Sequence, residues 1–424
     1  MKLLHIADLH IGKRVCGLSM IEEQNHVIDQ LASIACENSV AGVLIAGDVF
    51  DRPIPSREAL ETCERLFQAF CEREIPVFAI PGNHDSPQQL AFCSSLLASS
   101  GLHIAKAFDG RIDRFMLEED GQRVCIHLLP FVRPTDVRMA LPDSAEAIKT
   151  HEDAVRCALE CDELANDAVN ILVAHQFVTN RGASPQTCDS ELLSVGGSDS
   201  VDASVFDAYD YVALGHLHGP QHIGREQVRY SGSLLKYSFS EVNHKKSATV
   251  LSIEAGKLDI ETCEIAPLHD MREIHASYEE LQDPAFDEKS KLDYLRVTLS
   301  DRSLPDAMAK LRAIYPNILR LDWDAFEAPS EQAKKRMEKV ETESPLDLFD
   351  SFYELQTGSP LTPEERTIVA SCIEESSRCS PRSSPCRRSA PMRAAKSSTF
   401  PPSTMGFFSY PERRALARRR SSTP

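Results

Sequence analysis

The sequence has no long apolar segment and no cysteines at metal-binding spacing. No stretch of its 424 residues approaches the run of about 18 apolar residues that crosses a membrane, so we expect no membrane insertion. The 13 cysteines are scattered with no Cys-x-x-Cys pair, which argues against a disulfide framework and a cysteine zinc site. The first residues also lack the pattern of a secretory signal, and we expect a cytoplasmic protein.

Basic residues are scarce as well. Lys and Arg number 46 against 64 Asp and Glu, which gives a net charge of −18. A protein that binds DNA unaided presents a large cationic face, so any nucleic-acid role of this chain is local or shared with a partner. At roughly 150 residues per domain, the length predicts two to three domains.

Five short apolar runs predict buried strands, and each is followed by side chains that bind metals. The runs and the polar residues after them are Leu3–Ala7 with Asp8 and His10, Val43–Ala46 with Asp48 and Asp51, Val77–Ile80 with Asn83, His84 and Asp85, Ile171–Ala174 with His175, and Val212–Leu214 with His216 and His218. In open α/β sheets ligands gather outside the carboxyl ends of the strands, so these clusters are expected to converge.

Between the first three strands, apolar residues recur with helical spacing and predict a β-α-β-α-β opening. The two helix faces are Val27, Leu31, Ile34 and Ala35, then Leu60, Cys63, Phe67 and Phe70.

The mixture of carboxylate, imidazole and amide ligands favours transition-metal ions such as manganese, iron or zinc over calcium. Seven candidates are too many for one catalytic ion with an open position, but they suit two ions that share a carboxylate. Asp48 is the best bridge because Gly47 lets the backbone approach closely. Two ions of this kind activate water for phosphoester hydrolysis. The seven candidate ligands are Asp8, His10, Asp48, Asn83, His175, His216 and His218.

We expect a catalytic role for His84 rather than a ligand role. It stands beside Asn83, and we predict that Asp85 holds it away from the ions so that it faces the substrate. A histidine placed there stabilises the charge that develops on the phosphoryl group or protonates the leaving oxygen.

Together these motifs resemble the calcineurin-like metallophosphoesterases, and the flanking residues resemble the SbcD family of bacterial nuclease subunits over about residues 1–375. The superfamily motifs are Asp8-x-His10, Gly47-Asp48-x-x-Asp51, Gly82-Asn83-His84-Asp85, Ala174-His175-Gln176 and Gly215-His216-x-His218. The segments that carry the SbcD resemblance are Ile6-Ala7-Asp8-Leu9-His10-Ile11-Gly12, Ala46-Gly47-Asp48-Val49-Phe50-Asp51 and Tyr230-Ser231-Gly232-Ser233.

The resemblance implies an α/β fold, a four-layer α/β/β/α sandwich with a small αβ capping domain and a C-terminal helical segment. It implies two Mn²⁺ ions, the first held by Asp8, His10, Asp48 and His218 and the second by Asp48, Asn83, His175 and His216. It also implies association with an SbcC-type coiled-coil ATPase, as a homodimer within a heterotetramer that acts on DNA ends and hairpins. Asp51 departs from some relatives that carry a histidine there, and Gly219-Pro220 offers no basic residue.

The predicted layout has four parts: a nuclease domain at 1–268, a capping domain at 269–328, a linker with partner-binding helices at 329–375, and a Ser/Pro/Arg-rich tail at 376–424. Within the cap we expect strands at 294–299 and 318–323 and a helix at 306–314. The apolar stripes in 345–375 indicate either a surface that binds a partner or helices that pack on their own domain. The tail carries +10 against −28 before it; a basic arm, a disordered solvated tail and a shifted reading frame all stay open.

We predict a Mn-dependent DNA exonuclease and endonuclease subunit of DNA repair, recombination and replication. Alternatives are a small-molecule or protein phosphoesterase with the same site, and a metal-stabilised scaffold without catalysis. A basic cluster either contacts phosphate or is a solvated face; it comprises Arg225, Arg229, Lys236, His244, Lys245 and Lys246. Four histidines outside the motifs are expected to be ordinary core or surface residues: His5, His103, His127 and His222.

Overall fold

The computed structural model describes residues 1–191, 199–287, 289, 291–301, 303–324, 344–357 and 360–379. The chain divides into two compact units, Met1–Ala328 and Pro329–Pro424, and each is described by itself. The first unit holds two six-stranded sheets and a smaller three-stranded one.

The first sheet has the strand order β16-β15-β1-β4-β5-β6. β1, β4, β5 and β6 are parallel to one another. β15 pairs antiparallel with β1, and β16 pairs antiparallel with β15. Helices α1 and α2 connect the first three parallel strands, as the sequence predicts. The bounds are β1 Lys2–Ile6, α1 Ile21–Glu37, β4 Gly42–Ala46, α2 Arg57–Cys71, β5 Val77–Ile80, β6 Leu102–Ile104, β15 Ser247–Glu254 and β16 Lys257–Glu264.

The second sheet has the order β13-β14-β12-β9-β8-β7. Its four inner strands are parallel, and β7 and β13 are antiparallel edges. The bounds are β7 Asp113–Glu119, β8 Gln122–Leu129, α5 Pro134–Ala140, α6 His151–Leu159, β9 Val169–His175, β12 Tyr211–Gly215, β13 Gln221–Ile223 and β14 Arg225–Tyr230.

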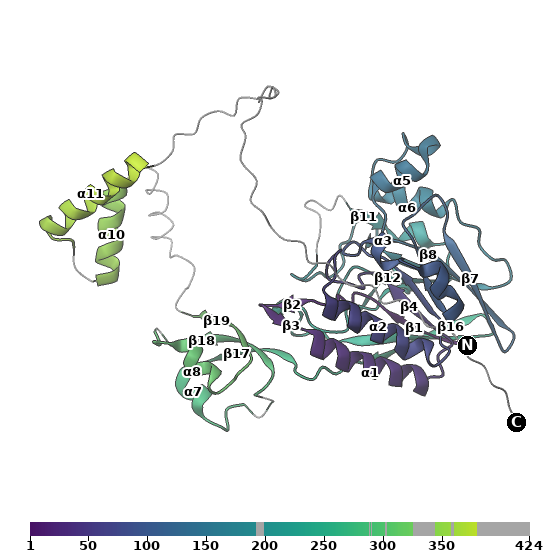
Figure 1. Ribbon diagram of the computed structural model, residues 1–424, viewed down its shortest axis with the longest axis horizontal. Helices are drawn as coiled ribbons and strands as arrows, with labels where there is room; N and C mark the ends of the chain where they lie inside the picture. The colour runs from purple at the N-terminus through teal and green to yellow at the C-terminus, as the bar shows by residue number, and fades with distance from the viewer. Residues whose placement is uncertain are drawn as a thin grey trace, which may run out of the picture. The chain divides into compact units, whose positions relative to one another are not determined.

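Alternating side chains divide the interior into three layers of apolar contact. In β4, Val43 and Ile45 pack with the α1–α2 side, whereas Leu44 packs in the central layer between the sheets. In β9, Leu172 packs with the α5–α6 side and Val173 in the central layer. Strands buried on both faces need cover on both sides, and Figure 1 shows α1 and α2 on one side of the strands and α5 and α6 on the other. The predicted four-layer sandwich is confirmed.

Shorter elements connect the main ones. They are β2 Arg14–Val15, β3 Leu18–Ser19, α3 Pro87–Leu90, α4 Ser94–Leu97, η1 Ala98–Ser100, η2 Pro142–Ser144, β10 Phe177–Thr179, β11 Ser200–Asp202, η3 Ala203–Phe206 and η4 Phe239–Glu241.

The cap follows as a three-stranded parallel sheet in the order β17-β18-β19. Both predicted strands are present with the predicted bounds, and the predicted helix forms over Ala307–Arg312. Glu23 on α1, fully buried, joins the cap to the first sheet, since it accepts hydrogen bonds from the Tyr294 hydroxyl and from His269. The bounds are β17 Met271–Ala276, α7 Tyr278–Gln282, β18 Tyr294–Leu299, α8 Ala307–Arg312 and β19 Ile318–Trp323.

The second unit contains two described helices, α10 (Pro345–Thr357) and α11 (Pro363–Cys379), which pack on each other. Arg366 joins them by bonding Asp347 at 2.7 Å. α11 runs to Cys379, so its last four residues belong to the predicted tail, and the rest of the tail lies outside the described residues. In the described part of the chain, no helix is long and apolar enough to cross a membrane.

Candidate metal centre

The two large sheets bring their carboxyl ends to one place. Asp8 and His10 follow β1, Asp48 follows β4, and His84 follows β5 in the first sheet, while His175 ends β9 in the second. All eight predicted ligand and catalytic side chains other than Asp85 take part in one network of short contacts, and groups of them have ligand atoms within 4.8 Å of one another.

The Asp48 carboxylate lies at the centre of this network. Its Oδ2 is 3.4 Å from His175 Nε2, 3.7 Å from His10 Nε2 and 4.0 Å from His84 Nε2. Its Oδ1 accepts the backbone N–H of His84 at 2.9 Å. One carboxylate therefore faces ring nitrogens from both sheets, which is the position that a bridging ligand needs.

Two groups of donors flank Asp48. On one side His10 Nε2 and His218 Nε2 are 3.0 Å apart, and Asp8 completes the group. On the other side the amide oxygen of Asn83 is 2.9 Å from His175 Nε2 and 3.0 Å from His216 Nδ1.

The unpaired nitrogens show that these residues fit bound cations. His10 Nδ1 and His216 Nε2 are buried and have no hydrogen-bond partner within the described ranges. Buried polar atoms normally find partners, so two unpaired ring nitrogens within one cluster of donors point to a group that the protein atoms alone do not supply. The donor set of imidazole, carboxylate and amide suits Mn²⁺ and related ions.

Burial sets the protonation of several ligands. It raises the pKa of Asp8 to about 7 and lowers the pKa of His216 to about 3, and it holds the pKa of His10 well below its usual range. Burial opposes the charged form of His175 too, but the nearby Asp48 carboxylate outweighs it and raises the pKa of His175 to about 9. Since metal ligation requires neutral imidazole and ionised carboxylate, metal binding would release protons here.

The backbone at the site adopts the left-handed region at non-glycine residues. φ is 53° at Asp8, 44° at His10 and 49° at Asp48. This region is unfavourable for residues other than glycine, and such strain clusters at functional sites. Hydrogen bonds between the two loops hold it, including His10 N to the carbonyl of Asp48 at 2.9 Å and Asp8 N to the carbonyl of Gly47 at 3.2 Å.

Asp85 does not hold His84 as predicted. Its carboxylate accepts the backbone N–H groups of Val49, Phe50 and Gly82 at 2.8–3.0 Å, which ties the loop after β4 to the loop after β5. The prediction was wrong about this contact because the closeness of the two loops is not visible in the sequence. Asp85 is thus a residue that positions the two loops.

The ring of His84 is fixed by Asp51 instead. His84 Nδ1 lies 3.0 Å from the carbonyl oxygen of Asp51. The Asp51 carboxylate binds Lys13 Nζ at 2.8 Å. Lys13, three residues after His10, was not identified from the sequence, although its place directly after the Asp8-x-His10 motif was a usable signal.

A second set of polar residues, also not predicted, supports His218. Ser190 Oγ lies 2.8 Å from His218 Nδ1 and donates to Glu241 at 2.6 Å. Lys246 is buried and pairs with Glu241 at 2.5 Å. Histidine ligands commonly bond a polar group through the other ring nitrogen, which fixes the tautomer and orientation.

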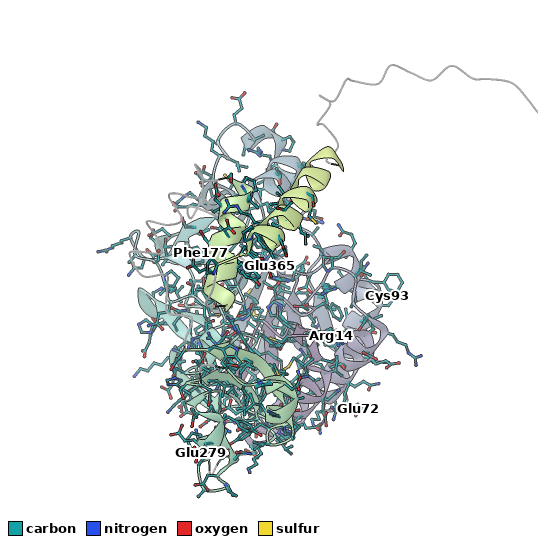
Figure 2. All side chains as sticks on the ribbon, turned by 90° about the vertical axis from the view of Figure 1, so that its left-hand side faces the viewer. Arg14, Glu72, Cys93, Phe177, Glu279 and Glu365 are labelled. Carbon is teal, nitrogen blue, oxygen red and sulfur yellow. The ribbon has the colours of Figure 1, made fainter. Side chains whose placement is uncertain are left out.

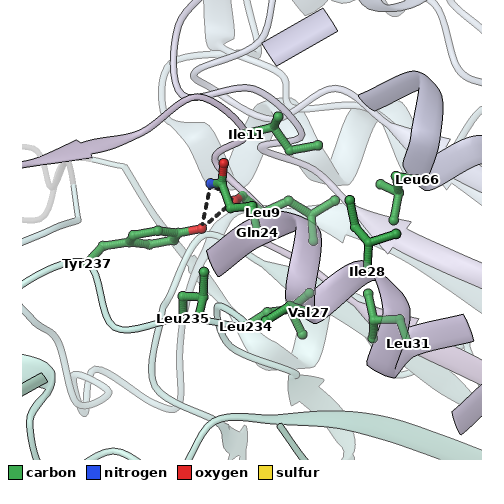
Figure 3. A pocket seen from close by; sticks show the side chains of 10 residues that line it. All are labelled: Leu9, Ile11, Gln24, Val27, Ile28, Leu31, Leu66, Leu234, Leu235 and Tyr237. Carbon is green, nitrogen blue, oxygen red and sulfur yellow. Dashed lines mark hydrogen bonds between the residues drawn. The ribbon is translucent and has the colours of Figure 1, made fainter. Parts of the chain in front are cut away.

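Gln24 and Tyr237 form hydrogen bonds to the loop after β1, and Figure 3 shows both side chains beside Leu9. The Gln24 amide donates to the carbonyl of His10 at 2.8 Å and to that of Leu9 at 3.2 Å, and Tyr237 donates to Leu9 at 2.5 Å. They border a small apolar cavity of about 20 Å³ between α1 and the loop after β14. The contact between Tyr237 and Leu9 joins residues 228 positions apart in the sequence, so no local pattern reveals it.

The structure divides the predicted basic cluster. Lys246 is buried in the pair with Glu241, Lys236 pairs with Asp270 at 2.8 Å, and Arg225 donates to the carbonyl of Tyr209 at 2.6 Å. These three cationic side chains therefore already have partners within the protein.

The other histidines are ordinary, as expected. His5 is buried between the sheets, 3.0 Å from the Tyr211 hydroxyl, and burial lowers its pKa to about 3. His127 is buried beside Asp162, His103 stacks on Phe78, and His222 is exposed.

Comparisons with known proteins find matches to two family models and to a curated relative. The family model described as "Calcineurin-like phosphoesterase" matches residues 1–220, and the model described as "Type 5 capsule protein repressor C-terminal domain" matches residues 267–357. The SbcD subunit of the nuclease SbcCD from Staphylococcus epidermidis is 33% identical over 368 residues, which cover 85% of this chain and 95% of that protein.

Two solved structures share weaker similarity. The TT1561 protein of Thermus thermophilus is 13% identical, with 62% of this chain and 98% of that chain covered and a TM-score of 0.36. A dimetal phosphatase from Danio rerio is 12% identical, with 63% and 98% covered and a TM-score of 0.37.

Proposed function

The chain belongs to the calcineurin-like phosphoesterases and, within them, to the family of SbcD nuclease subunits, and we propose that it is a Mn-dependent DNA nuclease that works in DNA repair and recombination. It is a hydrolase that acts on phosphodiesters. The observation that carries the proposal is the Asp48 carboxylate, which lies within 4.0 Å of ring nitrogens of His10, His84 and His175. Such an enzyme works where the bacterial chromosome is, in the cytoplasm.

The proposed ligands form two sets that share Asp48. One set is Asp8, His10, Asp48 and His218, and the other is Asp48, Asn83, His175 and His216. When bound, two divalent ions lower the pKa of water and neutralise phosphate charge. The chain's own residues keep these donors in place through the loop contacts of Asp85, Gln24 and Ser190.

His84 is the proposed catalytic residue. Its Nδ1 faces the carbonyl oxygen of Asp51, which only accepts hydrogen bonds, so Nδ1 carries a proton. The proposed role also requires a proton on Nε2, the nitrogen that faces the Asp48 side of the site. As the bond between phosphorus and the leaving oxygen breaks, His84 donates the Nε2 proton to that oxygen, while a water molecule adds its oxygen to phosphorus and releases a proton to solvent, from which His84 is protonated again.

The His84→Ala variant tests this role. We expect its hydrolysis of end-labelled duplex DNA in Mn²⁺ to fall by about 10²- to 10⁴-fold, because positioned proton transfer contributes that much. Bound Mn²⁺, measured by elemental analysis, should stay at the wild-type level.

A matched control is His222→Ala, which removes an exposed histidine outside the site. Unchanged nuclease activity of His84→Ala would refute the role of His84. Wild-type protein that cleaves small phosphoesters but neither duplex nor hairpin DNA, with or without an ATPase, would refute the nuclease function.

The proposed partner is an SbcC-type coiled-coil ATPase, bound by α10 and α11. Phe349, Phe352 and Ile368 on these helices are exposed, although they are large and apolar. A partner surface explains such exposure on a helical hairpin. An ATPase partner would also supply the cationic surface that the acidic chain lacks.

We propose in addition that two copies of the chain act together on DNA ends and hairpins. Phe92 and Leu96, in the short helical segment after β5, are both exposed on the first unit. A self-complementary apolar patch is what a two-fold dimer requires. Light scattering of wild type against a Phe92→Asp variant measures the state of assembly; a wild-type monomer would refute the dimer.

A further inference from the structure

A cavity of about 310 Å³ opens directly beside the proposed metal ligands. Asn83 and His216 form its inner end, and its walls come from the loop after β8 and from the residues that follow His175. This volume is near the lower end for small-ligand sites and suits one nucleoside rather than a duplex. What lines it indicates which ligand it accepts.

Two phenylalanines form the apolar part of the cavity. Phe131 follows β8 and Phe177 begins β10, directly after the His175 strand; Phe177 is labelled in Figure 2. The rings of Phe131 and His175 are 6.2 Å apart, as are those of Phe177 and His216, so both phenylalanines reach the ligand histidines. Aromatic faces at this place offer a stacking surface for a base.

Arg133 supplies a cation on the same wall. Its guanidinium carbon lies 5.6 Å from the centroid of the Phe131 ring. Across the residues that the structure describes, no ion pair of the Arg133 side chain is found, in contrast to Arg225 and Lys246, which are committed inside the protein. A guanidinium held over an aromatic ring and open to solvent is well suited to bind a phosphate oxygen.

Gln176 contributes an unpaired amide oxygen to the lining of the cavity. The side chain is 1% exposed and lines the cavity, yet its Oε1 has no hydrogen-bond partner in the described residues. A buried amide oxygen left unpaired is unfavourable, and an N–H group of a ligand would satisfy it. Nucleobases carry such N–H groups. His151 and Asp199 complete the polar lining.

We propose that this cavity binds the nucleoside next to the scissile phosphate, with its base against Phe131 and Phe177, an N–H of the base on Gln176, and a neighbouring phosphate on Arg133. The inference rests on the proposed nuclease function and specifies its substrate: a nucleotide unit of a DNA strand rather than a small ester. Aromatic walls, a cation and a buried acceptor within one volume of nucleoside size distinguish this cavity from a general phosphate site.

The test compares two esters that differ only in the nucleoside. Thymidine 5′-(p-nitrophenyl phosphate) carries it, and methyl p-nitrophenyl phosphate does not. For Phe131→Leu we expect kcat/KM on the thymidine ester to fall about tenfold, the loss expected for one stacked base, with the methyl ester within twofold of wild type. For Arg133→Gln we expect a similar loss only on the thymidine ester that also carries a 3′-phosphate, because that group supplies the neighbouring phosphate. The control is Arg57→Gln, an arginine on α2 whose side chain is 89% exposed.

A second readout does not depend on turnover. The fluorescence of 2-aminopurine deoxyriboside 5′-monophosphate should be quenched on binding to wild-type protein, because the base stacks, and the quench should be lost in Phe131→Leu. Bound Mn²⁺ should be equal in all variants. A wild type that quenches the probe but cleaves neither ester would support the cavity and refute the nuclease function.

Two results would overturn the inference while leaving the nuclease function intact. One is an unchanged preference for the thymidine ester in Phe131→Leu together with an unchanged preference for its 3′-phosphorylated form in Arg133→Gln. The other is an equal loss on both esters with lower bound Mn²⁺, which would mean that Phe131 and Arg133 only support the metal ligands.

Discussion

The position of the Asp48 carboxylate depends on the residue that it packs against. Gly82 follows β5, and a Cβ atom at Gly82 would lie 2.1 Å from Asp48 Oδ1 and 2.4 Å from its backbone nitrogen. No side chain fits there unless the loop that carries Asp48 moves. The Gly-Asn-His-Asp motif therefore requires glycine for steric reasons, in addition to the ligand and catalytic roles proposed for its other members.

We expect Gly82→Ala to lower the affinity for Mn²⁺ by about 10- to 100-fold, the loss typical when residues that orient metal ligands are changed. Isothermal titration with Mn²⁺ measures this affinity. The control is Gly256→Ala in the β15–β16 turn, where the added Cβ meets nothing within 4 Å and only backbone strain at φ +74° is introduced. Equal Mn²⁺ affinity of Gly82→Ala and wild type would contradict the packing argument.

A buried ion pair away from the metal centre predicts a pH dependence of stability. His127 Nδ1 lies 2.6 Å from Asp162, and its Nε2 is 3.0 Å from the amide oxygen of Asn170. Burial disfavours the charged ring, but the hydrogen bond to Asp162 outweighs it and raises the pKa of His127 to about 9. Because this pKa is higher in the folded state than the value near 6.5 in the unfolded state, the charged ring stabilises the folded protein. This contribution to the free energy of unfolding is complete below pH 6.5 and is lost as the pH rises through 9.

The expected contribution is on the order of 2–3 kcal/mol. Urea unfolding at pH 6 and pH 9.5 should show His127→Gln destabilised at pH 6 and much closer to wild type at pH 9.5. His222→Gln, an exposed histidine, serves as the control. A difference between His127→Gln and wild type that does not change with pH would contradict the assignment of charge to His127.

At the scale of elements, helix α1 connects the cap to the metal-binding loop. Its consecutive residues Glu23 and Gln24 are both buried. Glu23 accepts hydrogen bonds from Leu268, His269 and Tyr294 at the base of the cap, and Gln24 binds the carbonyl of His10. One helical turn thus touches both the cap and the loop that carries two proposed ligands.

Glu23→Gln should loosen the base of the cap, because an amide presents one acceptor oxygen where the carboxylate presents two. Loss of one or two buried hydrogen bonds costs about 1–3 kcal/mol. We expect faster limited proteolysis near residues 266–270 and a lower melting temperature. Glu22→Gln changes an exposed neighbour on the same helix and should match wild type. Equal proteolysis of both variants would show that Glu23 does not anchor the cap.

The elements also show where sequence patterns suffice. Buried strands were predictable because they are short apolar runs, and the ligand clusters because each follows such a run. The face of α2 was not fully predictable: Leu60, expected inside, is 52% exposed, while Ala59 and Leu66 are buried. A one-residue rotation of the helix keeps Cys63 and Phe70 inside, so the apolar pattern alone fits either face. Tertiary packing decides between them.

For the whole molecule, the network around the metal centre was only partly predictable. The proposed ligands are recognisable because metal-binding side chains are unusual directly after a buried strand. Glu241, Lys246 and Ser190 are ordinary polar residues whose role appears only when segments far apart in the chain meet. The four-layer architecture and the proposed chemistry therefore follow from the motifs, whereas the support of each proposed ligand follows from the fold. The predicted domain boundaries stay predictions.

Because the chain divides into two units, we predict that a substitution in the second unit can weaken partner binding without changing hydrolysis at the metal centre. Phe352 on α10 and Ile368 on α11 belong to the second unit and are 58% and 63% exposed, while every proposed ligand belongs to the first. Replacing either with Asp should remove a contact worth about 2 kcal/mol or more if it is central to the interface, a loss of roughly 30-fold in affinity for the coiled-coil ATPase. Hydrolysis of methyl p-nitrophenyl phosphate should be unchanged, because the metal centre is untouched.

Glu364→Gln, an exposed polar change on α11, is the control. ATPase binding that survives both Asp variants would place the partner surface elsewhere on the chain.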